Sequence, residues 1–144
     1  MAMAKTSILN KNEALTLLNN FFEAFQHWCN QPDSPSPADL EKFLSRNFQI
    51  SSNEKLLCKN LTEYHNRVMQ IRKKYAHVDI TGPLEEPLLC DNKIVIQYDL
   101  NLRTHEGQKN QVYLIAIGTI DNHKFSHWTQ ATHQKGTENW DKWQ

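Results

Sequence analysis

The chain has little glycine and no excess charge of either sign. Among its 144 residues four are glycine, and its 16 lysines and arginines balance its 16 aspartates and glutamates. So few glycines leave little material for a phosphate-binding loop, and the sequence contains neither a G-x-S-x-G motif nor a dinucleotide fingerprint. A balanced charge provides no basic field that would attract nucleic acid. We therefore expect no nucleic-acid partner and no cofactor.

Cysteine is also scarce, and long apolar runs are absent. The three cysteines, Cys29, Cys58 and Cys90, are scattered without a C-x-x-C pair, which is typical of free thiols in a reducing compartment. No run of residues is long and apolar enough to span a membrane, and residues 1–9 lack the apolar core of a signal peptide. We expect a soluble, cytoplasmic protein with no membrane partner.

Three segments in the first half of the chain carry apolar residues at spacings of three and four, which predicts helices. The first covers residues 14–29 and follows a capping box that begins at Asn10. The second begins at Ser36, with proline at the first helical position, and its short buried face extends to Leu44. The third begins at Asn60, with another capping box.

The other segments alternate apolar and polar residues, as strands do. Short strands are predicted at 48–52, 55–58 and 77–81, and longer ones at 93–103, 111–120 and 124–133. Helices followed by consecutive strands predict an α+β fold, in which the N-terminal helices pack in the concave face of a strongly curved, mixed, mainly antiparallel sheet. Such a sheet forms a cone with a pocket. We expect one domain over residues 1–133 and a polar tail over residues 134–144.

The last predicted hairpin, Val112–Trp128, has a recognisable pattern. An apolar strand leads into a turn, after which come a lysine, an apolar residue and the polar-aromatic pair His127-Trp128. This pattern, together with the order of elements over about residues 15–133, resembles the nuclear transport factor 2-like superfamily and especially its SnoaL-like branch. His123 stands where that family commonly has glycine. The resemblance implies a cystatin-like α+β cone and a homodimer formed through the outer faces of two sheets.

Enzymes of this superfamily include polyketide cyclases, ketosteroid isomerases and dehydratases, and the resemblance implies an acidic or His-Asp pair inside the cone that moves protons beside a carbonyl. The sequence shows no carboxylate with a clear inward position, because Asp99 has the opposite parity from Tyr98 on the same strand. His127 is the only inward histidine candidate on the sheet. Histidine is the residue type that commonly serves as a general acid or base near neutral pH, so His127 is the predicted catalytic residue.

The register of the last hairpin decides which side chains face the cone. With residues 122–123 as a two-residue turn, Gly118 pairs with His127 and Ala116 pairs with Thr129. The two small residues then leave space on the inner face, and the polar tips of their neighbours surround it. This arrangement is typical of a mainly apolar pocket with a few orienting groups.

Neighbouring strands contribute to the same face. The preceding hairpin places Tyr98 near Ala116, and a slip of the last hairpin by one residue would turn Trp128 and Gln130 inward in place of His127. The predicted ligand-binding residues are Tyr98, His127, Thr129, Ala116, Gly118, Phe25, Trp28 and Tyr64.

The other face of the long strands has an apolar centre that a monomer would leave in water. We expect a twofold homodimer through this face. The predicted interface consists of Tyr113, Ile115, Ile117, Trp128 and Gln97. The alternative is that the tail, with Trp140 and Trp143, folds back over the same surface.

Three functions are compatible with these features. The first is noncatalytic binding of a small apolar or aromatic molecule, which the missing inward carboxylate favours. The second is a cofactor-free lyase, isomerase or cyclase, in which His127 moves a proton and Tyr98 orients a carbonyl. The third is an adaptor that binds a protein through the outer sheet. No metal site is expected, because the turn and the alternating faces separate His123 and His127.

Overall fold

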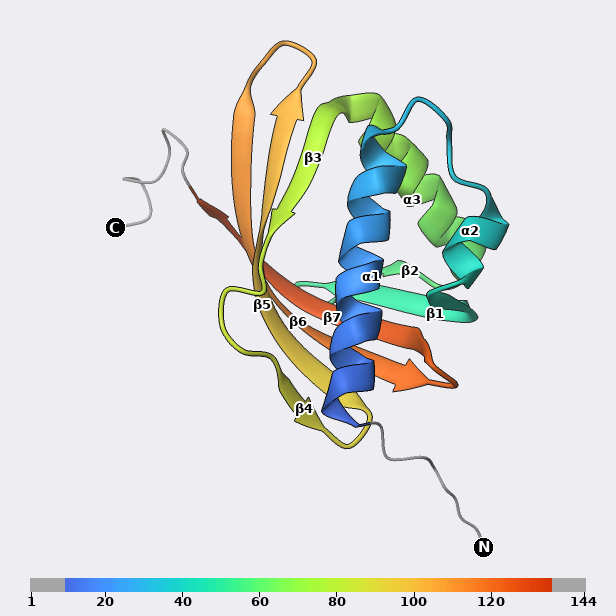
Figure 1. The fold of residues 1–144 in the computed structure, drawn as a ribbon. Helices are drawn as coiled ribbons and strands as arrows, with labels where there is room; N and C mark the ends of the chain where they lie inside the picture. The colour runs from blue at the N-terminus through green and yellow to red at the C-terminus, as the bar shows by residue number, and fades with distance from the viewer. Residues whose placement is uncertain (1–9, 136–144) are drawn as a thin grey trace, which may run out of the picture.

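The computed structural model describes residues 10–135, which form three helices and one curved seven-stranded sheet (Figure 1). The elements are α1 (Lys11–Asn30), α2 (Pro37–Glu41), β1 (Leu44–Ser52), β2 (Lys55–Cys58), α3 (Leu61–Lys74), β3 (Tyr75–Thr81), β4 (Leu88–Cys90), β5 (Lys93–Thr104), β6 (Lys109–Asp121) and β7 (Lys124–Lys135). The predicted α+β class, with helices in the concave face of the sheet, is confirmed.

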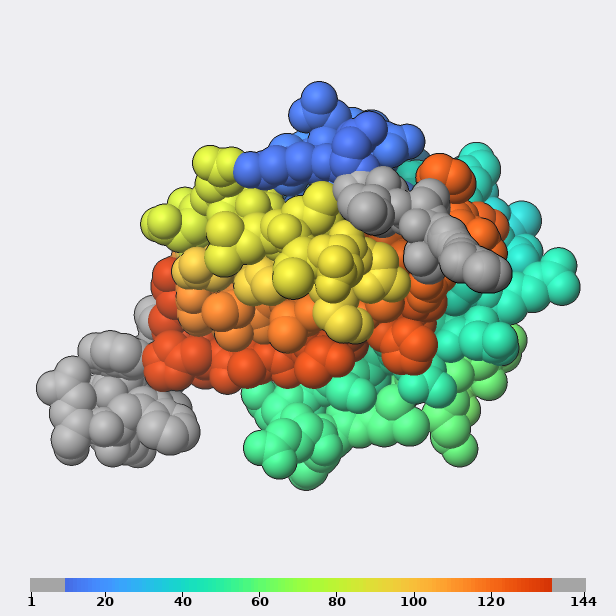
Figure 2. Space-filling view, turned by 90° about the horizontal axis from the view of Figure 1, so that it is seen from below, coloured from blue at the N-terminus to red at the C-terminus, as the bar shows by residue number. Residues whose placement is uncertain are grey.

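The strands lie in the order β2-β1-β7-β6-β5-β3, and β4 pairs with β5. Figure 2 shows β5, β6 and β7 as successive yellow, orange and red bands, with the green of β1 and β2 beyond them. β1 runs parallel to β7 and every other pair is antiparallel, so the predicted mixed, mainly antiparallel sheet is also confirmed. Register shifts interrupt four of the pairings, and such bulges bend a sheet.

The helix starts follow the predicted capping chemistry. The side chains of Asn10 and Asn60 each accept a hydrogen bond from the backbone N–H three residues later, at 2.8 and 2.9 Å. Ser36 forms a reciprocal capping box with Asp39. The predicted extent of the second helix was wrong, because α2 ends at Glu41 and Leu44 begins β1. Leu44 is fully buried opposite Phe125 of β7, a partner 81 residues away that local spacing does not reveal.

α1 also protects the outer edge of the sheet. β3 is a terminal strand, and an unpaired strand edge invites association with other chains. Asn30 bonds both to the N–H of Val78, at 2.9 Å, and to its carbonyl, at 2.6 Å. Gln26 accepts from the N–H of Ile80 at 2.9 Å. Two amide side chains of α1 thus form hydrogen bonds with backbone groups at the free edge of β3, and these bonds hold α1 against the sheet.

One strand and one strand end differ from the predictions. β4 has three residues and lies close after Pro87, so its short pattern gives no strand signal. β7 continues through Gln134 and Lys135, which were predicted to begin the polar tail. Lys135 forms an ion pair with Asp99 on β5 at 3.0 Å. The polar composition of residues 134–135 gives no sign of this contact across the sheet. The rest of the predicted tail, including Trp140 and Trp143, lies outside the described residues.

The last hairpin has the predicted turn but not the predicted register. Asn122 and His123 both have positive φ, 51° and 65°, as a two-residue hairpin turn requires. Ile120 pairs with Phe125, but Thr119 pairs with His127, so Ser126 is an extra residue in β7. This bulge reverses the alternation beyond it. The predicted pairing of Gly118 with His127 was therefore wrong, and Gly118 pairs with Trp128.

The register between β5 and β6 also differs from the predicted one, but this difference does not change which side chains face the cone. Tyr98 pairs with Leu114 and not with Ala116, which shifts the pairing by two residues. A shift of two keeps every side chain on its face, so Tyr98 still points into the cone as predicted. No helix within residues 10–135 is long and apolar enough to cross a membrane.

Candidate functional site

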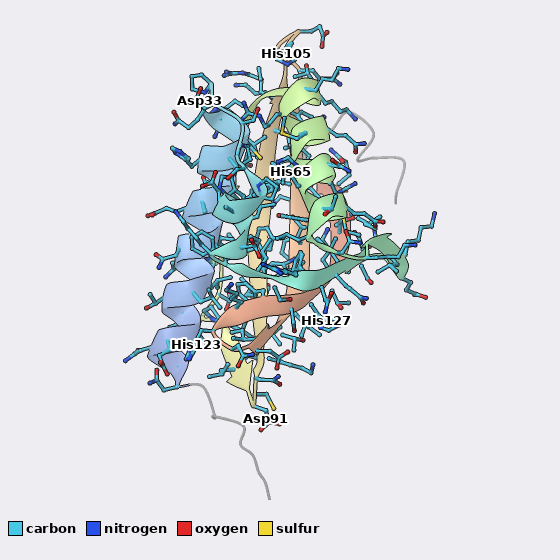
Figure 3. The ribbon with its side chains drawn as sticks, turned by 90° about the vertical axis from the view of Figure 1, so that its right-hand side faces the viewer. Asp33, His65, Asp91, His105, His123 and His127 are labelled. Atoms are coloured by element: carbon cyan, nitrogen blue, oxygen red, sulfur yellow. The ribbon has the colours of Figure 1, made fainter. Side chains whose placement is uncertain are left out.

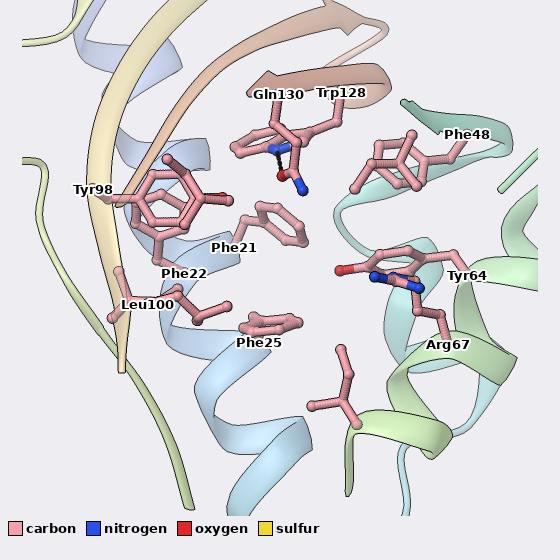
Figure 4. Close-up of a pocket in the computed structure, with 14 residues that line it drawn as sticks. Phe21, Phe22, Phe25, Phe48, Tyr64, Arg67, Tyr98, Leu100, Trp128 and Gln130 are labelled. Carbon is pink, nitrogen blue, oxygen red and sulfur yellow. Dashed lines mark hydrogen bonds between the residues drawn. The ribbon is translucent and has the colours of Figure 1, made fainter. Parts of the chain in front are cut away.

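A cavity of about 100 Å³ lies between α1, α3 and the concave face of the sheet. Figure 4 shows its walls and the residues around it. The lining residues are Phe21, Phe22, Phe25, Phe48, Ile50, Tyr64, Arg67, Ile71, Ile80, Tyr98, Leu100, Leu114, Trp128 and Gln130. The cone is therefore open, but side chains narrow it strongly.

Aromatic rings from opposite elements form most of the wall. The centroids of Phe22 on α1 and Tyr98 on β5 are 4.8 Å apart, and those of Phe21 and Trp128 are 5.5 Å apart with a steep edge-to-face tilt. Phe48 of β1 and Tyr64 of α3 form another edge-to-face pair at 5.1 Å. Such pairs are favourable beyond their buried area, so this wall is well defined.

The bulge and one glycine bring Trp128 to the cavity. A Cβ atom at Gly118 would lie 2.8 Å from Cε1 of Phe125 and 3.2 Å from Cε3 of Trp128. The two rings on β7 thus fill the space that a side chain at this position would need. The predicted role of Gly118 and Ala116 in leaving pocket space was wrong for this reason: neither residue lines the cavity.

Polar groups reach the cavity at a few points. The indole N–H of Trp128 donates to Oε1 of Gln130 at 3.1 Å, and the amide nitrogen of Gln130 donates to Ser52 at 3.2 Å. One amide hydrogen of Gln130 remains for another acceptor. Figure 4 shows the hydroxyl groups of Tyr64 and Tyr98 directed toward the interior from opposite walls.

Burial keeps both of these phenols protonated. It raises the pKa of Tyr64 well above its usual value, and the nearby Arg67 charge opposes this effect only weakly. Burial likewise raises the pKa of Tyr98. Neither hydroxyl loses its proton near neutral pH, so both remain able to donate a hydrogen bond.

Arg67 is the charged residue of the lining. It lies on α3 three residues after Tyr64, which places the two side chains on the same face of the helix. Its side chain is exposed at the mouth of the cavity (Figure 4). Within residues 10–135 no carboxylate forms an ion pair with it.

The predicted ligand-binding residues divide into three groups. Tyr98, Tyr64 and Phe25 line the cavity. Trp28, Ala116 and Gly118 lie inside the fold without reaching it. His127 and Thr129 are exposed on the outer face, because they follow the bulge, and their predicted inward placement was wrong.

His127 instead lies in a small polar cluster near the β6–β7 turn. Ser126 Oγ is 2.6 Å from Oδ2 of Asp121 and 3.1 Å from Nδ1 of His127. The serine hydroxyl donates its proton to the carboxylate, so it can only accept from the histidine. A serine nucleophile needs the opposite direction, with the histidine accepting its proton. The three residue types of a catalytic triad are present, but their arrangement stabilises the bulge.

The histidines and acidic residues are spread over the molecule. Figure 3 shows His105 at the β5–β6 hairpin, His65 on α3, and His123 and His127 around the β6–β7 hairpin. His65 bonds to the carbonyl of Pro35 at 2.8 Å. In the part of the chain from 10 to 135 no group of three His, Cys, Asp or Glu side chains is placed to hold a metal ion.

Eleven lining residues were absent from the predicted ligand-binding set, and three of them, Arg67, Trp128 and Gln130, are instructive for different reasons. Arg67 has a signal in the sequence, its spacing of three from Tyr64 on the same helix. Trp128 and Gln130 face inward only because of the bulge. A one-residue slip of the last hairpin would turn these two side chains inward, as the alternation in the sequence predicts. The bulge adds one residue to β7 and so has the same effect.

The outer face keeps most of its predicted features. Ile115 and Ile117 are each 41% exposed there, and Tyr113 donates to Oε1 of Gln97 at 2.7 Å. The predicted placement of Trp128 in this surface was wrong, because its ring is 3% exposed and faces the cavity.

No protein-family model and no curated protein matches the sequence. Solved structures do match. AusH from Aspergillus nidulans is 13% identical with a TM-score of 0.70, over 91% of this chain and 90% of that one. A protein assigned as a SnoaL-like polyketide cyclase from Jannaschia sp. CCS1 is 10% identical with a TM-score of 0.68, over 91% of both chains. An NTF2-like protein from Anabaena variabilis is 9% identical with a TM-score of 0.67, over 92% of this chain and 97% of that one.

Identities this low establish the fold alone. The predicted resemblance is thus confirmed in its architecture, and the chain has the nuclear transport factor 2-like fold, in the form that SnoaL-like proteins share.

Proposed function

We propose that this protein binds a small apolar or aromatic molecule inside the cone without transforming it chemically. One observation carries the proposal. The cavity is lined by aromatic and aliphatic side chains with a few polar tips, and its fourteen lining residues, all within the described range, include no histidine, aspartate or glutamate. A mainly apolar cavity with a few orienting groups is the usual form of a small-molecule site.

The same lining argues against proton-transfer catalysis in the cone. A general acid or base needs a group that titrates near the working pH and reaches the bound molecule. The phenols of Tyr64 and Tyr98 have raised pKa values, and His127 is on the other face of the sheet. The lyase or isomerase alternative therefore has no group to support it at this site.

The size of the cavity restricts the bound molecule. A cavity of about 150 Å³ holds benzene in a well-studied case, and this one has about 100 Å³. The interior alone is thus smaller than a cavity that encloses benzene, so a small ring or a short chain fits inside it only in part. Phe25 and Ile71 are only half-buried at the mouth, so a larger molecule extends outward past them.

The first test is native mass spectrometry of freshly purified protein, under gentle and under denaturing conditions, followed by titration with toluene. We expect a retained molecule in the gentle spectrum, or a toluene-dependent shift of the Trp128 indole N–H resonance. Leu100→Trp fills the mouth and should abolish both signals. Leu102→Trp is the matched control, since Leu102 is equally half-buried on β5 but does not line the cavity. The proposal would be refuted if the purified protein retained no small molecule and toluene did not shift the Trp128 resonance.

We also propose that the protein is a homodimer through the outer face, with Tyr113, Ile115, Ile117 and Gln97 near the centre. The exposed isoleucine pair supports this, because association would remove it from water. Sedimentation equilibrium should give a dimer that Ile117→Lys converts to a monomer. Leu56→Lys, at a 52% exposed leucine on β2, should leave the dimer intact. A monomeric wild-type protein would contradict the dimer and favour the adaptor that binds another protein here.

Two further proposals concern context. We propose that the chain forms a single domain, as its one core cluster supports, and that it works in the cytoplasm. The location is supported by three free thiols, two of them buried, which a reducing compartment preserves.

A further inference from the structure

We infer that the molecule bound in the cone carries a carboxylate, which pairs with Arg67 at the mouth while its apolar or aromatic body occupies the ring-lined interior. This inference rests on the proposed binding function and specifies the chemical class of the ligand.

The position of Arg67 is the first reason. The cavity is lined by buried rings at its inner end and by exposed or half-buried residues at its mouth, and Arg67 belongs to the second group. Two other arginines are engaged with protein groups: Arg46 bonds to Glu41 at 2.7 Å, and Arg72 bonds to the carbonyls of Trp28 and Pro32. The fourth, Arg103, is exposed and does not line the cavity. Arg67 forms no hydrogen bond or ion pair of this kind within residues 10–135, so its donors are available to a ligand.

The second reason is that no acidic side chain of the lining neutralises this cation. Glu63, one turn earlier on α3, is already occupied, since its Oε1 accepts from the N–H of Lys59 at 2.9 Å. The other polar groups that reach the cavity also have hydrogens to donate, namely the Tyr64 hydroxyl and the second amide hydrogen of Gln130. The groups available to a ligand are therefore one cation and several hydrogen-bond donors. Such a site favours a ligand that carries an anionic hydrogen-bond acceptor.

The third reason concerns the type of anion. A guanidinium group matches the two oxygens of a carboxylate in a planar, bidentate geometry. A phosphate monoester carries about two charges at neutral pH and usually needs more than one cation. With one arginine and an apolar interior, the site fits a monoanion attached to a small ring or short chain. The charge stays in the solvent-exposed mouth, so it is never buried without a partner.

The test compares benzoate with benzamide, two probes of nearly equal shape of which only the first is charged. Binding is followed by the Trp128 indole resonance at low ionic strength. Wild-type protein should bind benzoate about fivefold more tightly than benzamide, the scale of a partly exposed ion pair. Added salt should reduce this preference.

Two variants separate the role of Arg67 from a general effect of charge. Arg67→Gln should weaken benzoate about fivefold and leave benzamide unchanged. Arg103→Gln removes an exposed arginine that does not line the cavity, and it should change neither affinity. Arg67→Lys should retain part of the preference, because it keeps the charge and loses the bidentate geometry.

The outcomes distinguish the two proposals. Equal binding of both probes by wild-type protein, or a preference that survives Arg67→Gln, would overturn the carboxylate inference and leave the apolar binding site standing. Failure of both probes and of toluene to move the Trp128 resonance would overturn the binding function itself, and the carboxylate inference with it.

Discussion

The two faces of the same sheet have different compositions, although they are made by the same strands. On the concave face Phe48 and Phe125 are fully buried, and rings of α1 and α3 pack against rings of the sheet. On the convex face Ile115 and Ile117 are each 41% exposed. The concave face thus holds the fold together and lines the cavity. The convex face is available for association.

Charge is also distributed differently between the faces. The concave cavity has one arginine at its mouth and no carboxylate. The convex face has a connected polar network, in which Asp99 is only 6% exposed and is bonded by Lys135 at 3.0 and 3.1 Å. An ion pair compensates the burial of Asp99 on the outer side. Strand alternation thus separates the chemistry of the cavity from that of the surface, and the bulge at Ser126 decides on which face Trp128 and His127 lie.

The largest effect should come from removing a ring of the concave face. Phe125→Ala should lower the free energy of unfolding by about 3–5 kcal/mol, because it leaves a hole among packed aromatic side chains. Thr129→Ala, at an exposed position of the same strand, should change it by less than about 0.5 kcal/mol. Urea denaturation of the two variants measures both values. Losses of similar size would mean that the two faces do not differ as described.

A smaller effect should follow from adding one methyl group to the concave face. Gly118→Ala should lower the free energy of unfolding by about 1–3 kcal/mol through overpacking, since its Cβ would lie 2.8 Å from a carbon of the Phe125 ring. Thr119→Ala, one residue along β6 and on the other face, should stay within about 0.5 kcal/mol. Thermal or urea unfolding checks both. A neutral Gly118→Ala would show that the Phe125 ring moves aside freely.

A third difference should appear at alkaline pH. Burial raises the pKa of Cys29 from 9.0 to about 12, so folding retains a proton that the unfolded chain loses above pH 9. The free energy of unfolding should therefore fall as pH rises through this window, by up to about 1.4 kcal/mol per pH unit for one thiol. Cys29→Ala should reduce the slope between pH 9 and 10. The remaining slope comes from Cys58, Tyr64 and Tyr98, whose pKa values burial also raises.

The control for this experiment is Cys90→Ala, because Cys90 is exposed. It should keep the wild-type slope. If Cys29→Ala kept the same slope, the buried thiol would not be the source of the alkaline instability.

The smallest effect should come from His127. His127→Ala should change the free energy of unfolding by less than about 0.5 kcal/mol, and it should leave the response of the Trp128 resonance to toluene unchanged. Gln130→Ala should move that resonance, because it removes the acceptor of the indole N–H. Loss of toluene binding in His127→Ala would place the histidine inside the cone and contradict the bulge.

Much of the fold was predictable because it depends on neighbours in the chain. The caps at Asn10, Ser36 and Asn60 and the turn at 122–123 are set by side-chain chemistry within a few residues. The order of the helices and of every strand except β4 follows from the spacing of apolar residues. Three residues predicted to contact a ligand, Tyr98, Tyr64 and Phe25, do line the cavity.

What the sequence by itself determined is therefore the set of elements and the faces of most strands. The tertiary structure decided the start of β1 at Leu44, the pairing of Lys135 with Asp99, and the inward position of Trp128 in place of His127. Each depends on contacts between segments far apart in the chain or on one extra residue in a strand. Alternation has a period of two, so a single bulge reverses it. The packing of Phe125 and Trp128 over Gly118 and the hydrogen bonds of Ser126 favour the bulged register.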